Sequence, residues 1–238
     1  MDLVREREQE SRAALLAGRY GGLEGEALLA PLLEHELAGR IALLSSFGAE
    51  AALLLGMVAQ IDRATPVLFI DTGKLFGETL RYRDALVERL GLSDVRRLAP
   101  DPQEVARRDP DGTLWHRDPD ACCQLRKVEP LARAFGPFDA VISGRKRHHG
   151  GERGALPAIE LADGLIRVNP LWNYGQNRVA QAFAERGLPP HPLEADGFRS
   201  IGCMPCTDRV APDEALRAGR WRGRDKTECG IHGNRVSP

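Results

Sequence analysis

The chain has 238 residues, of which 42% are hydrophobic and 28% are charged, and a formal net charge of -1. This length predicts one α/β domain with an appended segment at most. The near-zero charge argues against a partner bound through bulk electrostatics, so we expect neither a nucleic acid nor a membrane as partner. The charged start, MDLVREREQESR, is not a secretory signal, and we expect a cytoplasmic protein.

The first 38 residues are rich in Leu, Ala, Glu and Arg, and their leucines have helical spacing. This pattern predicts one or two amphipathic helices, which we expect to form an N-terminal helical cap over 1–38. Residues 41–61 follow as an apolar stretch long enough to resemble a membrane span. Because Glu50 lies near its centre, we interpret it as a strand, a turn and a buried helix.

Short apolar runs bounded by turn residues alternate with helical patterns along the next part of the chain. We predict strands at 41–44, 67–70, 95–98 and 140–142, and helices at 49–61, 76–90, 103–108, 122–135 and 177–186. This alternation is typical of βαβ units, so we expect an α/β fold with an open, mainly parallel sheet over 39–188. From residue 189 to 238 the composition shifts to Pro, Gly and Arg without periodicity, which predicts a loop-rich C-terminal tail that folds back on the same domain.

Two loops follow predicted strands at the sheet edge where open parallel sheets bind ligands. The first, SSFGAE at 45–50, offers hydroxyls and amides at a helix N-terminus, which suit a phosphate or sulfate group. The second is DTGK at 71–74. Each loop alone also fits a simple helix cap. Neither a Walker A sequence nor G-x-G-x-x-G occurs, so ordinary NTPase and dinucleotide-binding functions lose support.

The five cysteines fall as an adjacent pair, Cys122 and Cys123, a C-x-x-C at Cys203 and Cys206, and a single Cys229. An odd number without a secretory signal argues against a disulfide framework. Four thiolates suit a 4Fe-4S cluster or a structural zinc ion. Adjacent helical side chains point about 100° apart, which favours a cluster over one small ion. The alternative is that the adjacent pair is simply buried in a helix.

Cys229 stands apart in the segment KTECGIH at 226–232. A thiol near Lys and His is the setting in which its pKa falls and the thiolate becomes a nucleophile. A lower pKa also weakens nucleophilicity, so most of the rate must come from positioning and from neutralising an anionic substrate. The basic runs at 217–226 and 145–147 offer cations for that task, although such runs are also typical of a solvated face.

Taken together, these motifs resemble the assimilatory adenylyl-sulfate (APS) and phosphoadenylyl-sulfate (PAPS) reductase family. The resemblance covers residues 41–232 and rests on SSFGAE, FIDTGKLFGETL, CCQLRKVEPL, ISGRKR, RVNPL, GFRSIGCMPCT, RAGRWRG and KTECGIH. It implies a fold of the adenine-nucleotide α-hydrolase (PP-loop) type. It also implies reduction of APS to sulfite and AMP, as part of sulfate assimilation and cysteine biosynthesis.

The resemblance further implies that Cys229 attacks the substrate sulfur and forms an S-sulfocysteine, from which thioredoxin or glutaredoxin releases sulfite. The 4Fe-4S cluster would be held by Cys122, Cys123, Cys203 and Cys206, with Lys127 bridging toward the sulfate end. The expected catalytic residues are Cys229, Lys127 and His232. The expected substrate-binding residues are Ser45, Ser46, Gly48, Asp71, Gly73, Arg145, Arg217 and Arg220.

The sequence departs from this family after the predicted strand at 140–142. Where the family usually has an aromatic or acidic residue, then Gln and often Ser, this chain has His148-His149-Gly150. We expect this histidine pair to lie in a solvent-exposed loop.

Several alternatives stay open. The complete cysteine set is typical of family members that prefer APS, but the sequence does not exclude PAPS or dual specificity. A PP-loop ATP pyrophosphatase would share the fold, although SSFGAE lacks the Lys-Asp-Ser ending of such proteins. An iron-sulfur redox sensor would bind nucleic acid through 217–226, with strong salt dependence. A homo-oligomer is left open.

Overall fold

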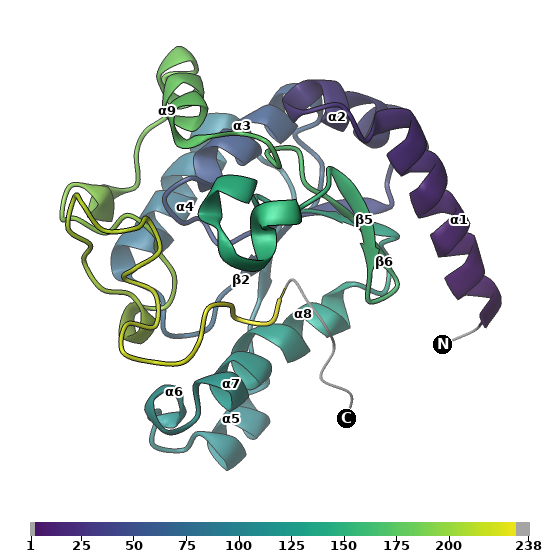
Figure 1. Cartoon of the computed structure of the whole chain (residues 1–238). Helices are drawn as coiled ribbons and strands as arrows, with labels where there is room; N and C mark the ends of the chain where they lie inside the picture. Colours follow the sequence, from purple (N-terminus) through teal and green to yellow (C-terminus); the bar gives the residue numbers. More distant parts are fainter. Residues whose placement is uncertain (1–2, 232–238) are drawn as a thin grey trace.

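A six-stranded sheet organises the chain (Figure 1). The computed structural model describes residues 3–231. The strands are β1 (Ile41–Ser45), β2 (Val67–Ile70), β3 (Val95–Leu98), β4 (Ala140–Ile142), β5 (Ile159–Ala162) and β6 (Leu165–Val168), in the order β3-β2-β1-β4-β6-β5. All neighbouring strands are parallel except β5 and β6. The predicted open, mainly parallel sheet is therefore confirmed, and the strand order reverses between β1 and β4.

Helices cover both faces of the sheet. The α-helices are α1 (Leu3–Tyr20), α2 (Gly25–Pro31), α3 (Ala51–Ile61), α4 (Gly77–Leu90), α5 (Pro102–Arg108), α6 (Leu114–Arg117), α7 (Pro119–Cys123), α8 (Glu129–Ala134) and α9 (Gln176–Glu185). Shorter helical turns are π-helical at Leu32–Glu36 and Gln124–Val128, and 3₁₀ at Arg147–His149, Gly151–Ala155, Pro192–Glu194 and Met204–Cys206.

The alternation of side chains along each strand builds two cores. In β1, Ile41 and Leu43 point into the larger core, which α1, α2, α3, α4 and α9 cover. The intervening Ala42 and Leu44 point into a smaller core on the other face, where Leu131 of α8 packs. Because both faces are covered, β1 and β2 are buried at every position and, apart from Ser45, entirely apolar, which is the pattern that indicated strands in the sequence.

The helices begin and end where local signals place them. Asp118 caps α7 by accepting hydrogen bonds from the amides of Asp120 (3.1 Å) and Ala121 (2.9 Å), and Pro119 starts the helix. Gly91, directly after Leu90, ends α4 in the left-handed conformation (φ 65°). The apolar stretch 41–61 is β1 followed by α3, and no helix within residues 3–231 is long and apolar enough to cross a membrane.

The described part of the first 38 residues is helical, as predicted, and α1 runs beside β5 and β6 (Figure 1). A buried carboxylate ties it to the sheet. Asp139, just before β4, accepts hydrogen bonds from Gln9 (3.1 Å), Arg12 (3.0 Å) and Arg40 (2.7 Å). The cap is thus attached at the amino ends of the strands.

The sequence prediction missed the hairpin of β5 and β6 and the short α6. The hairpin carries a recognisable signal, because its two strands are joined by Asp163 and Gly164, both with positive φ (54° and 73°). The helix predicted at 122–135 starts earlier, at Pro119, and includes the π-helical turn Gln124–Val128.

Candidate active site

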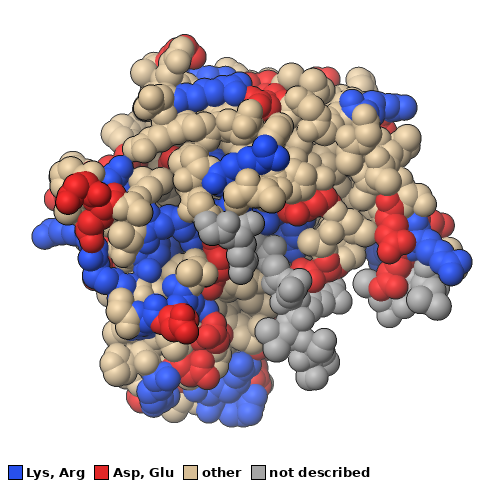
Figure 2. Space-filling view, in the orientation of Figure 1, with Lys and Arg blue, Asp and Glu red and all other residues tan. Residues whose placement is uncertain are grey.

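A cleft lies at the carboxyl ends of β1 and β4, where the strand order reverses and where ligands bind in open α/β sheets. The loop after β1, the loop after β4 and the C-terminal tail form its walls. Lys and Arg side chains gather in this hollow of the surface (Figure 2). Of the predicted site residues, those lining the cleft are Ser45, Ser46, Gly48, Lys127, Arg145, Cys203, Arg217, Arg220 and Cys229.

The loop after β1 turns sharply toward the cleft. Ser45 accepts a hydrogen bond from the amide of Phe47 (3.2 Å), and Phe47 is fully buried with a positive φ of 49°. A side chain at Gly48 would bring its Cβ to 2.9 Å from the carbonyl oxygen of Ile201. Glycine at this position therefore lets the tail pack directly on the loop.

The loop after β2 contributes differently from the prediction. Asp71 accepts hydrogen bonds from the amide of Gly73 (3.0 Å) and from Arg97 (2.7 Å), and neither Asp71 nor Gly73 lines the cleft. Thr72 between them does, and its hydroxyl lies 3.3 Å from the sulfur of Cys203. The loop thus supports a cysteine through a residue that the sequence did not single out.

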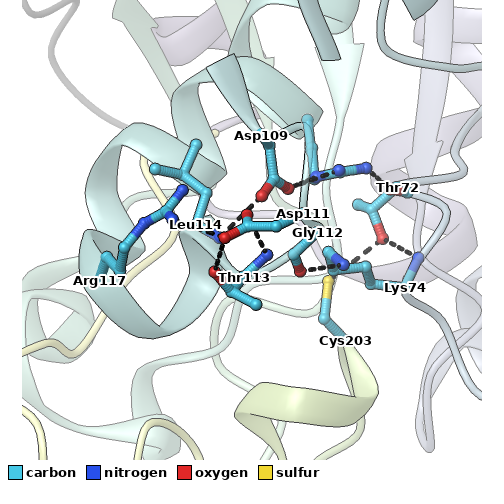
Figure 3. A network of polar contacts seen from close by, with 10 residues as sticks. Thr72, Lys74, Asp109, Asp111, Gly112, Thr113, Leu114, Arg117 and Cys203 are labelled. Carbon is cyan, nitrogen blue, oxygen red and sulfur yellow. Dashed lines mark hydrogen bonds and ion pairs between the residues drawn. The ribbon is translucent and has the colours of Figure 1, made fainter. Parts of the chain in front are cut away.

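The two cysteine pairs meet because the tail returns to the sheet. Cys122 and Cys123 end α7, and Cys203 pairs with Leu75 in an isolated antiparallel bridge. Arg126 fixes the helical side of this junction by donating hydrogen bonds to Asp109 (2.6 Å) and to the carbonyl of Thr72 (2.9 Å). Figure 3 shows Asp109, Thr72 and Cys203 together, with Lys74 bonded to the carbonyl of Gly112 (2.7 Å).

The distances between the cysteine sulfurs bear on whether they suit a zinc ion or an iron-sulfur cluster. All five are free thiols. Within residues 3–231, three possible metal-ligand atoms lie within 4.8 Å of one another only in the group Glu50, His148 and His149. No three cysteines of this part of the chain form such a group. Tetrahedral zinc with bonds of about 2.3 Å needs sulfurs about 3.8 Å apart. As placed, the four cysteines do not form the compact tetrahedron that one zinc ion needs.

The buried thiols are poor nucleophiles by themselves. Burial raises the pKa of Cys122 to about 11, and it raises the pKa of Cys123 and Cys206 as well. A metal group would deprotonate such thiols, whereas a nucleophile needs a thiolate without that help. Ligand roles for these three cysteines agree with their environment.

Cys229 is half-buried in the cleft and faces Lys127. Burial alone would lower the pKa of Lys127, but the thiol groups of Cys229, Cys203 and Cys123 outweigh it and leave the pKa above its ordinary value. Lys127 is therefore a permanent cation between Cys229 and the other cysteines. Lys226 instead forms an ion pair with Asp120, and His232 lies outside the described residues.

The structure adds Arg153 and Glu228 beside Cys229, two residues that sequence reasoning missed. Arg153, from the 3₁₀ turn Gly151–Ala155, donates two hydrogen bonds of 2.8 Å to the carboxylate of Glu228. Arg217 donates a third, of 3.2 Å. Arg153 lies in a glycine-rich stretch without periodicity, so nothing in the local sequence marked it.

The other two predicted arginines, Arg145 and Arg220, differ in whether an acidic side chain of the protein already pairs with them. Arg145 lines the cleft but forms an ion pair with Glu160. Arg220 lies over the ring of Trp221 (4.4 Å to its centroid), close against Gly202, where a Cβ would meet the guanidinium at 2.3 Å. Gly202 thus leaves room for the Arg220 side chain across the tail.

The expectation of a solvent-exposed histidine pair is wrong. The side chain of His149 is only 9% exposed, and its ring lies 3.1 Å from Glu50 and 3.1 Å from Arg153. His148 is half-buried, and its Nδ1 lies 2.7 Å from the carbonyl of Tyr174. The 3₁₀ turn Arg147–His149 folds the pair inward, which a sequence pattern cannot show. Lys146 binds the same oxygen of Glu50 (2.7 Å), so this group does not suit a metal cation.

Comparison with known proteins agrees with this geometry. Residues 40–209 match the family described as phosphoadenosine phosphosulfate reductase domain. The chain is 47% identical to adenosine 5'-phosphosulfate reductase of Mesorhizobium japonicum, over 93% of this chain and 87% of that protein. It is 36% identical to phosphoadenosine 5'-phosphosulfate reductase of Gloeobacter violaceus, over 91% and 92% of the two chains.

Among solved structures, the chain is similar to a phosphoadenylyl-sulfate reductase from Candida auris in complex with phosphate. The TM-score is 0.68 at 25% identity, and the match covers 83% of this chain and 96% of the other. Yeast FAD synthetase shares the fold alone, with a TM-score of 0.52 at 17% identity, over 85% of this chain and 75% of the other.

Proposed function

The chain belongs to the phosphoadenosine phosphosulfate reductase domain family, and we propose that it reduces APS to sulfite and AMP in the cytoplasm, for sulfate assimilation. The observation that carries this proposal is the position of Cys229. This thiol lies at the strand-order reversal, with Lys127, Arg217 and Arg220 lining the same cleft. One nucleophile among cations is what attack on a phosphosulfate anion requires.

In the proposed reaction the thiolate of Cys229 attacks the sulfur of APS. The bond between that sulfur and the bridging phosphate oxygen breaks, AMP leaves with the electron pair, and Cys229 carries an S-sulfo group. Lys127 and the arginines neutralise the charge of the phosphosulfate during this step. The SSFGAE loop, with Ser45, Ser46 and Gly48, offers the second anchoring point for the nucleotide phosphate.

Release of sulfite needs a reductant, for which we propose thioredoxin or, alternatively, glutaredoxin. A thiolate of the reductant attacks the sulfur of Cys229, sulfite leaves, and a second thiol of the reductant resolves the mixed disulfide. Cys229 returns as a thiol and the reductant leaves as a disulfide. The half-buried position of Cys229 at the cleft is compatible with such an approach.

We also propose that Cys122, Cys123, Cys203 and Cys206 hold one 4Fe-4S cluster per chain. When bound, the cluster would help to polarise the sulfate end of the substrate and would not serve as the electron donor. The residues around the ligands prepare the site. Thr72 supports Cys203, Arg126 fixes the helical turn that follows Cys123, and Lys127 faces the sulfurs.

APS is the proposed substrate in preference to PAPS. The relatives from Mesorhizobium japonicum and Chelativorans, at 47% and 46% identity, are named adenosine 5'-phosphosulfate reductases. The relative named for the phosphorylated substrate is more distant, at 36%. Dual specificity is the competing possibility, and parallel assays with both nucleotides distinguish the two.

The decisive experiment compares wild type with Cys229→Ser after anaerobic purification. We expect wild type to release sulfite and AMP from APS with thioredoxin, and the variant to lose this activity by at least a thousandfold, because a hydroxyl cannot replace the thiolate. The brown absorbance of the cluster should be the same in both proteins. A Cys229→Ser protein with wild-type activity would overturn the proposed mechanism.

A further inference from the structure

His149 joins two charged groups of the cleft wall. Its Nε2 lies 3.1 Å from a carboxylate oxygen of Glu50, at the start of α3, and its Nδ1 lies 3.1 Å from Nη1 of Arg153. A guanidinium can only donate hydrogen bonds, so Nδ1 must accept one. The proton of the ring is therefore on Nε2, from which it is donated to Glu50. These contacts together define a neutral imidazole with a single tautomer.

The bonds continue from Arg153 to the nucleophile. The Nε and Nη2 atoms of Arg153 donate to the carboxylate of Glu228, each at 2.8 Å, and Glu228 directly precedes Cys229. Only Nη1 is directed at His149. The side chain of Arg153 is 11% exposed, so few other partners can hold it in this orientation. A continuous chain of hydrogen bonds thus runs from Glu50 through His149 and Arg153 to the residue beside Cys229.

We propose that neutral His149 is a positioning residue, which orients Arg153 toward the anionic end of the substrate and toward the segment that carries Cys229. This inference rests on the proposed function. His149 acts through Arg153, and it need not touch the substrate.

The charged groups around the His149 ring influence the pH at which the ring stays neutral and keeps its bond to Arg153. Glu50, Lys146, His148 and Arg153 all face His149, and Glu228 with Arg217 lies beyond Arg153. Burial lowers the pKa of His149, Lys146 and His148 lower it further, and Glu50 opposes them. Protonation would place a hydrogen on Nδ1 directed at the guanidinium, so the bond to Arg153 would be lost. Acid conditions should therefore weaken substrate binding.

The test uses three variants of the full, iron-loaded chain. His149→Gln keeps one donor and one acceptor but does not titrate, whereas His149→Leu removes both. His35→Leu makes the same change at an exposed histidine and serves as the matched control. Initial rates of sulfite release from APS with thioredoxin give KM and kcat in steps from pH 8 to pH 5. Calorimetric titration with AMP measures binding without turnover.

At pH 8 we expect His149→Leu to raise KM about tenfold, through loss of a charge-assisted hydrogen bond, with a smaller change in kcat. His149→Gln and His35→Leu should stay within about threefold of wild type. Because burial lowers the pKa of His149, the imidazole protonates only well below its ordinary value, so lowering the pH to 5 should raise KM of wild type more than that of His149→Gln. AMP affinity should follow the same order as KM.

An unchanged KM in His149→Leu, or equal losses in the Leu and Gln variants, would overturn the positioning role. If His149→Leu does not fold, the pH responses of wild type and His149→Gln decide alone, and identical responses would count against the inference. Failure of the proposed function would look different. Wild type itself would then release no sulfite from APS, while the AMP titrations would still separate the variants.

Discussion

The reactive chemistry of the cleft is divided between one thiol and the cations around it. Cys229 is half-buried and has no metal-ligating partner assigned, whereas burial raises the pKa of the thiols of Cys122, Cys123 and Cys206. Lys127 faces both groups of sulfurs and keeps its charge. The raised pKa of three thiols and the position of Lys127 support the proposed division of the five cysteines into four ligands and one nucleophile.

Cys123→Ser tests the ligand half of this division. We expect the variant to lose most of its iron and the visible absorbance of the cluster, because a serine hydroxyl is a poor replacement for a thiolate ligand. Iron and acid-labile sulfide per chain are the measurements, and Cys229→Ser is the matched control that should keep both. An iron-replete Cys123→Ser protein with an unchanged spectrum would refute the assignment.

Among the elements, the 3₁₀ turn Pro192–Glu194 controls how the tail leaves the sheet. His191 caps it, since its Nδ1 accepts a hydrogen bond from the amide of Leu193 (3.2 Å). Its Nε2 lies 3.1 Å from the hydroxyl of Thr79 in α4, and its ring packs on Tyr82. This buried, neutral histidine therefore anchors the start of the segment that carries Cys203, Cys206 and Cys229.

The anchor gives the fold a defined acid sensitivity. Burial lowers the pKa of His191 to about 4, below its ordinary value of 6.5. Between these values the unfolded chain binds a proton that the folded chain does not, so the free energy of unfolding should decrease as the pH falls from about 6.5 to about 4. The slope for this one group is at most about 1.4 kcal/mol per pH unit.

Urea unfolding of wild type and His191→Asn at several pH values between 6.5 and 4 isolates the contribution of His191 to the pH dependence of the unfolding free energy. Asn can still cap the turn but does not titrate. We expect the wild-type protein to lose more stability on acidification than the variant does. Parallel curves for the two proteins would show that His191 is not the group responsible.

In the whole molecule, the groups that stabilise the fold and the groups of the proposed reaction lie at opposite ends of the strands. The cleft lies at the carboxyl ends of β1 and β4, while the buried carboxylate of Asp139 holds α1 at the amino end of β4. Long-range contacts at the amino ends thus attach the helical cap. Loops and tail at the other ends supply the reactive groups.

Asp139→Ala should accordingly lower stability without changing catalysis. Removing the carboxylate leaves Gln9 and the guanidinium groups of Arg12 and Arg40 without their shared acceptor, which should cost about 1–3 kcal/mol of unfolding free energy. Chemical denaturation measures that loss, and KM and kcat for APS should stay within about twofold of wild type. A large rise in KM with unchanged stability would contradict this separation.

The sequence predicted β1, β2 and β4 well because both faces of these strands are buried, whereas the edge strand β3 exposes Arg96 and Arg97. The runs at 67–70, 95–98 and 140–142 match β2, β3 and β4, and the turn residues around them set their limits. The hairpin of β5 and β6 was missed, although Asp163 and Gly164 offered the signal of a tight turn. At the site, local motifs predicted the cysteines, Lys127 and the SSFGAE loop.

By itself, then, the sequence determined the strands β1 to β4, the grouping of the cysteines as two pairs and a single thiol, and the family resemblance, because these depend on residue types at short spacings. Only the tertiary structure placed Arg153 between His149 and Glu228, and showed Asp71 outside the cleft, paired with Arg97. The physical reason is that hydrogen bonds between Glu50, His149, Arg153 and Glu228 join loops far apart in the chain. Their geometry exists only once the sheet has brought the carboxyl ends of its strands together.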